Sequence, residues 1–98
     1  MANKREVKKD IRYLTEQVII DALEVSEMLE KEKDKKKVLD LIVEIAELHN
    51  NLISRVNHPD GTANSSLVKI HFNAIIDELM NTCNKAYEKL NKLLPEQQ

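Results

Sequence analysis

Residues that form turns are scarce in this sequence, and so are aromatic residues. Glycine occurs once and proline twice among 98 residues, and tryptophan is absent. A typical globular domain contains about 7% glycine and 5% proline, and sandwiches, barrels and βαβ folds need a turn about every ten residues. The shortage therefore excludes those folds and favours a few long helices.

Long apolar runs and clusters of cysteine are also missing. The longest unbroken apolar runs, such as residues 18–20, contain three residues, whereas a membrane-spanning helix needs about 20. The first residues are charged and lack the apolar stretch of a secretory signal. Cys83 is the only cysteine, so it cannot form a disulfide within the chain. We expect a cytoplasmic protein with no membrane partner.

The balance of charge gives no support for a polyanionic partner. Fifteen Lys and Arg residues face seventeen Asp and Glu residues, which gives a net charge of -2 at pH 7. Such a chain generates no global field that attracts nucleic acid. The densest basic run, residues 31–37, lacks aromatic side chains for base stacking and is interpreted as a solvated hairpin tip. We therefore expect no nucleic-acid partner.

Apolar residues recur at steps of three and four along three segments, which is the periodicity of amphipathic helices. The first helix is predicted over about 4–30, with Asn3 and Glu6 resembling a capping box at its start. The second is predicted over about 35–57, with Asp34 as its N-cap. Its apolar residues cover so much of its circumference that it needs neighbours on more than one side.

A third helix is predicted over about 66–94, after a loop at 58–65 that contains Gly61, and Pro95 stops it. The three segments predict an all-α fold, an antiparallel up-down-up three-helix bundle formed by a single domain over 1–98, which dimerisation could complete. Residues 31–37 contain neither Gly nor Pro. One continuous helix over 4–57 therefore stays open as an alternative, as does a hairpin closed between two chains.

Charge is arranged in blocks that bear on the orientation of the helices. Residues 1–12 sum to +3, residues 13–30 to -5 and residues 31–37 to +3. In an antiparallel bundle the acidic end of the first helix lies near basic segments of the other two, which would specify their orientation. We expect Glu24, Glu27 and Glu30 to lie beside Lys35, Lys36 and Lys37 and beside Lys85, Lys89 and Lys92.

Two pairs of glutamates form the one pattern that suggests metal chemistry. They have the i, i+3 spacing that puts each pair on one helical face, and they are Glu24 and Glu27 followed by Glu44 and Glu47. Four converging carboxylates would bind Mg²⁺, which takes oxygen ligands. The pattern resembles the all-α nucleoside triphosphate pyrophosphohydrolases of the MazG type, which carry E-x-x-E on one helix and E-x-x-D on the next, although Glu47 replaces the final Asp. The resemblance implies, as an alternative function, an Mg²⁺-dependent pyrophosphohydrolase.

Other catalytic groups are poorly placed. Cys83 falls on the apolar stripe of the third helix, where a thiol behaves as a small core residue. His49, His58 and His71 show no metal-ligand spacing. We therefore expect neither a cofactor nor enzymatic activity.

Surplus apolar residues beside the main stripes support the leading functional hypothesis. A three-helix bundle of this size leaves part of them exposed, and exposed apolar patches mark association sites. We predict a non-enzymatic helical bundle that mediates protein–protein association, with a second copy of the chain as the expected partner in a homodimer. The predicted interface residues are Ile19, Ile20, Leu23, Leu29, Leu39, Val43, Ile53, Ile76, Met80, Tyr87 and Leu94.

Overall fold

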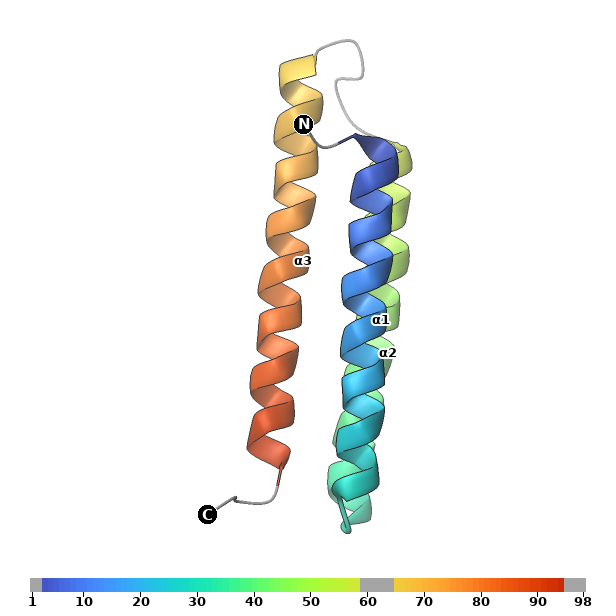
Figure 1. The fold of residues 1–98 in the computed structure, drawn as a ribbon, viewed down its shortest axis with the longest axis vertical. Coiled ribbons are helices and arrows are strands. Elements are labelled where there is room, and N and C mark those ends of the chain that lie inside the picture. Colours follow the sequence, from blue (N-terminus) through green and yellow to red (C-terminus); the bar gives the residue numbers. More distant parts are fainter. Residues whose placement is uncertain (1–2, 59–64, 95–98) are drawn as a thin grey trace.

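The computed structural model describes residues 3–58 and 65–94, and three long helices account for nearly all of them (Figure 1). α1 spans Lys4–Met28, α2 spans Glu32–Asn57 and α3 spans Ser65–Leu93. α1 and α2 form an antiparallel hairpin, and α3 runs in the same direction as α1 (Figure 1). The predicted all-α, up-down-up three-helix bundle is confirmed. None of the described helices combines the length and the apolarity needed to cross a membrane.

The start of α1 agrees with the prediction. The Asn3 side chain accepts a hydrogen bond of 2.9 Å from the backbone N–H of Glu6. This bond satisfies one of the N–H groups that have no partner inside the first turn of a helix. α1 ends at Met28, two residues before the predicted boundary, because the backbone of Leu29 is extended.

The connection between α1 and α2 lies at residues 29–31, so the prediction of a reversal over 31–37 is wrong. Leu29 is buried and packs into the core, which holds the reversal at this point in the chain. The N-cap of α2 is Lys31, which makes no side-chain capping bond, and Asp34 lies in the first turn instead of capping the helix. Lysine and glutamate are good helix formers, so the charged segment joins α2. The continuous helix over 4–57 is wrong as well.

The other boundaries differ from the predictions by one residue or less. α2 ends at Asn57, as predicted, and α3 begins at Ser65 and ends at Leu93. Gly61, Pro95 and most of the predicted loop at 58–65 lie outside the described residues.

A single apolar core runs along the bundle, which measures 53 × 24 × 15 Å. Each helix contributes the stripe predicted from its periodicity, and the buried Cys83 is part of it. The buried apolar residues are Val7, Ile11, Val18, Ala22, Val25 and Leu29, then Val38, Leu41, Ile45, Leu52 and Val56, then Phe72, Ile75, Leu79, Cys83, Ala86 and Leu90.

Thr15 is a polar residue within this core, and it is 1% exposed. Its hydroxyl donates a hydrogen bond of 2.7 Å to the carbonyl of Ile11 and lies 3.2 Å from the carbonyl of Arg12. Both acceptors belong to the preceding turn of α1, so the hydroxyl is satisfied locally and makes no contact that specifies the packing of another helix.

We expect the substitution Thr15→Val to leave the free energy of unfolding unchanged or to raise it by up to about 1 kcal/mol, because a buried methyl group replaces a hydroxyl whose hydrogen bond offsets its desolvation. Thr15→Ala is the control, since it removes buried volume and should lower stability. Urea unfolding followed by circular dichroism measures both. A loss of more than about 1 kcal/mol in the valine variant would show that the hydroxyl stabilises the native state.

Candidate association surface

The structure separates the predicted interface residues into exposed and packed groups. Leu29 belongs to the core. Those half-buried against the core are Ile19, Ile53, Ile76, Tyr87 and Leu94. Those exposed are Ile20, Leu23, Leu39, Val43 and Met80. Only the exposed group offers apolar side chains to a partner without rearrangement of the bundle.

Four of the exposed residues belong to the α1–α2 hairpin. Ile20 and Leu23 lie on α1, Leu39 and Val43 lie on α2, and their exposed fractions range from 48% to 59%. An antiparallel hairpin places the first half of α2 alongside the second half of α1 (Figure 1). We name these four residues the hairpin patch. Met80 is on α3 and is separate from this set.

The hairpin patch continues into a charged stripe on the outer side of α1. The stripe residues follow one another at steps of three and four, so they share one side of the helix, and every one of them is exposed. This outer stripe comprises Arg5, Lys9, Arg12, Glu16, Ile20, Leu23 and Glu27, and Glu30 follows just after the helix. Apart from Glu16, which lies between its basic and apolar parts, the stripe is therefore basic at the start of α1, apolar in the middle and acidic at the end.

The outer stripe was not predicted, although its signal is present in the sequence. Counting charge in consecutive blocks shows the change from basic to acidic along this helix, and sorting the same residues at steps of three and four shows that the charges share one side with Ile20 and Leu23. Its basic part borders a hollow of about 670 Å³ on the surface. The residues that line this hollow are Lys4, Arg5, Lys8, Lys9, Arg12, Tyr13 and Glu16.

The charges of the outer stripe have no counter-ion within the described part of the chain. The ion pairs found there join Lys35 to Glu32, Arg55 to Glu78, and Lys89 to Glu44. None of these ion pairs involves Glu24, Glu27 or Glu30, so the expected pairing of these carboxylates with the lysines of α2 and α3 does not extend to ion pairs.

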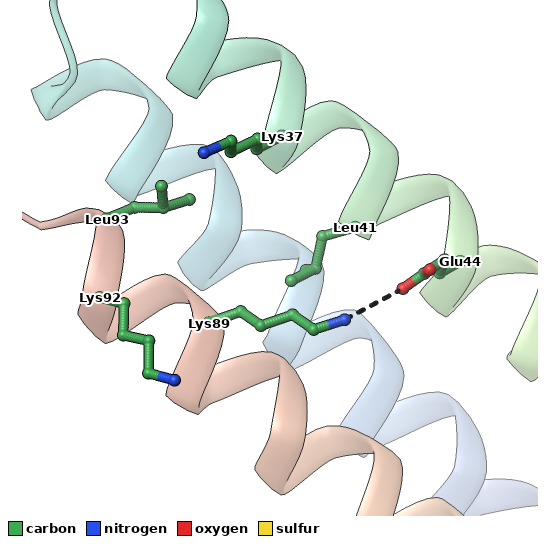
Figure 2. Close-up of a pocket in the computed structure, with 6 residues that line it drawn as sticks. All are labelled: Lys37, Leu41, Glu44, Lys89, Lys92 and Leu93. Atoms are coloured by element: carbon green, nitrogen blue, oxygen red, sulfur yellow. Dashed lines mark ion pairs between the residues drawn. The ribbon is translucent and has the colours of Figure 1, made fainter.

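The ion pair of Lys89 joins α3 to α2. Its ammonium group lies 3.9 Å from the carboxylate of Glu44, across the groove between α2 and α3 (Figure 2). Lys89 and Lys92 thus lie on the side of α3 that borders α2. The groove has a volume of about 300 Å³. It is lined by Lys37, Leu41, Glu44, Lys89, Lys92 and Leu93.

The carboxylates of the magnesium alternative do not converge. Among residues 3–58 and 65–94, no three His, Cys, Asp or Glu side chains come together in a group that could hold a metal ion. Glu44 illustrates the reason, since it turns toward α3 and Lys89 (Figure 2). The ligand set Glu24, Glu27, Glu44 and Glu47 is therefore not assembled.

Cys83 does not supply a nucleophile. The side chain is 5% exposed, and burial raises the pKa of its thiol. The reactive thiolate is thus disfavoured at neutral pH. This environment fits the role of a core residue that its periodicity predicts.

Polar contacts occupy the surface between α2 and α3. The His71 Nε2 atom lies 2.8 Å from the backbone carbonyl of Arg55, and because a carbonyl only accepts, Nε2 donates the proton. This bond satisfies one of the carbonyl groups that have no partner at the end of α2. The guanidinium of Arg55 pairs with Glu78 at 2.9 Å. These contacts connect the end of α2 to α3.

A second polar contact connects α1 to α3. The hydroxyl of Tyr87 donates a hydrogen bond of 2.6 Å to Asp21, and the other oxygen of that carboxylate accepts one of 3.3 Å from Gln17. Burial of the ring, followed by the hydrogen bond to Asp21 and its negative charge, raises the pKa of Tyr87 well above its usual range. The hydroxyl thus has a partner in the bundle.

We expect Tyr87→Phe to lower the free energy of unfolding by about 1 kcal/mol at pH 7, because it removes a hydrogen bond to a carboxylate that is only partly buried. Because the pKa of Tyr87 is raised in the folded protein, its contribution to the free energy of unfolding is fully present below pH 10, the usual pKa of a tyrosine. That contribution is lost as the pH rises above this value. The difference between the wild type and Tyr87→Phe should therefore shrink above that pH. Tyr13→Phe, at a 67% exposed ring, is the control. Equal stabilities of wild type and Tyr87→Phe at pH 7 would contradict the expectation.

No family model matches the chain, and neither a curated protein nor a solved structure matches it. The functional argument therefore depends on the exposed surface of α1 and α2.

Proposed function

We propose that the protein is a cytoplasmic, non-enzymatic helical bundle that acts through protein association, and that it forms a homodimer through the hairpin patch. The observation that carries the proposal is the exposure of Ile20, Leu23, Leu39 and Val43 on adjacent helices. Exposed apolar side chains gathered on one surface are typical of association sites.

The size of the hairpin patch supports a modest affinity. Burying the half of an isoleucine or leucine side chain that is still exposed contributes about 1 kcal/mol. A patch of four such residues on each copy competes with an association cost of about 4–15 kcal/mol. The apolar contribution alone thus supports a weak dimer, and a tighter one needs additional polar contacts.

An enzymatic function receives less support from the same surface. The hollow beside the start of α1 is lined by five cations and Tyr13, with Glu16 as its single carboxylate. The magnesium alternative needs a ligand set that the described residues do not assemble. Association thus explains the exposed apolar residues without requiring a rearranged active site.

We expect the wild type to sediment as a species of about twice 11.3 kDa at tens of micromolar concentration. The double substitution Leu23→Asp with Val43→Asp should shift it to the monomer, because it places charges in the centre of the patch. Ile70→Asp with Met80→Asp is the matched control, since these residues are 63% and 44% exposed on α3, outside the patch. Far-UV circular dichroism checks that all variants fold.

Two results would contradict this proposal. A wild type that remains at 11.3 kDa up to about 100 µM would exclude a dimer of useful affinity. A double variant that dimerises as well as the wild type would show that association uses another surface.

A further inference from the structure

We infer that two copies of the chain associate with their α1 helices antiparallel, so that the basic start of each outer stripe faces the acidic end of the other. This inference rests on the proposed self-association and adds its orientation, its register and the charges that specify it.

The first observation is that the charges of α1 oppose its helix dipole. Cations are favoured at the end of a helix and anions at its start, each by about 0.3–1 kcal/mol. α1 has no basic residue in its last turn, where Glu27 lies instead, and in the first turn Lys4 and Arg5 outnumber the one favourable anion, Glu6. A local rule that is broken without compensation is a feature of functional sites.

The second observation is that the bundle itself supplies no compensation. Within residues 3–58 and 65–94, the ion pairs involve other side chains than those of the outer stripe. Arg12 and Glu27 cannot pair inside one helix, because fifteen residues separate them by about 22 Å. Within the described residues neither charge thus has a partner, which leaves both available to a second molecule.

One partner satisfies both ends of the stripe together. A second copy placed antiparallel brings its acidic end to the basic start of the first copy, and the two-fold symmetry of a homodimer forms each contact twice. A parallel copy would place like charges together. A polyanion would satisfy the basic start and leave Glu27 unpaired. The antiparallel copy thus accounts for both parts of the stripe.

The spacing of the stripe also specifies a register. When Arg12 lies opposite Glu27 of the second copy, Glu16 lies opposite Leu23 and Ile20 lies near the two-fold axis. A shift by one helical turn in one direction would place Glu16 opposite Glu27 and Arg12 opposite Lys31, and opposed like charges select against that register. A shift by one turn in the other direction would lose the contact between Arg12 and Glu27 and place Arg12 opposite the apolar Leu23. The favoured register puts the apolar part of the stripe at the centre and the ion pairs at both ends.

Charge reversal tests this arrangement. Arg12→Glu and Glu27→Arg should each weaken dimerisation about tenfold or more, because each homodimer then contains two like-charge contacts. The double variant should regain wild-type affinity within about threefold, since its charges are exchanged on both copies. An equimolar mixture of the two single variants should form a heterodimer, because all its contacts are again between opposite charges.

Matched controls are available on α3. Lys85→Glu and Glu88→Arg make the same changes in net charge at exposed positions outside the stripe, and they should leave the dissociation constant unchanged. Sedimentation equilibrium at low and high salt measures the constants, and added salt should reduce the differences between the charge variants because it screens exposed charges.

Disulfide trapping gives an independent test of orientation. Arg12→Cys on a tagged copy should cross-link to Glu27→Cys on an untagged copy under mild oxidation, while each variant alone should cross-link poorly. Efficient linkage between two Arg12→Cys copies would instead show a parallel dimer and overturn the inference. So would a wild-type dimer that is insensitive to Arg12→Glu and Glu27→Arg, although the proposed self-association would stand. A wild type that is monomeric at all concentrations would overturn both.

Discussion

The packing of one apolar stripe from each helix into a shared core is the constraint on which the rest of the structure depends. The stripes advance by three and four residues, so they stay on one side of each helix over its whole length. With turn-forming residues so scarce, the chain has few places to reverse. Long helices joined by short connections are the arrangement that buries all three stripes, and the side chains outside the stripes are then left for solvent or for a partner.

Polar side chains in or beside this core need hydrogen-bond partners, because they are removed from water. Thr15 satisfies its hydroxyl within its own helix, so it joins the core without specifying the position of another helix. Tyr87 and His71 lie at the border of the core, where each reaches an acceptor on a neighbouring helix. Directional contacts thus surround the core and specify the position of α3, whereas the core itself provides the non-directional attraction.

Periodicity predicted the helices and most of the core, because burial repeats at the helical period whatever the neighbouring helix is. It located the first reversal poorly, because the lysine-rich segment forms helix readily and the burial of Leu29 depends on tertiary packing. The partners of the ion pairs were not predicted either. Charge blocks constrain which ends of helices meet, but the choice of Glu44 as the partner of Lys89 depends on which flank of α3 faces α2. The sequence pattern distinguished only partly between exposed apolar residues and those at the edge of the core, because both kinds lie beside the main stripe of each helix.

The slender shape of the bundle has a consequence for its cooperativity. A molecule 53 Å long and 15 Å across in its thinnest direction has a core only about one layer of side chains deep at each level. Core side chains in neighbouring layers along the bundle pack against one another, whereas distant layers are connected only through the backbones of the helices. Opening can therefore begin at either end and proceed level by level, so amide hydrogens should exchange in a gradient from the ends toward the middle of the bundle.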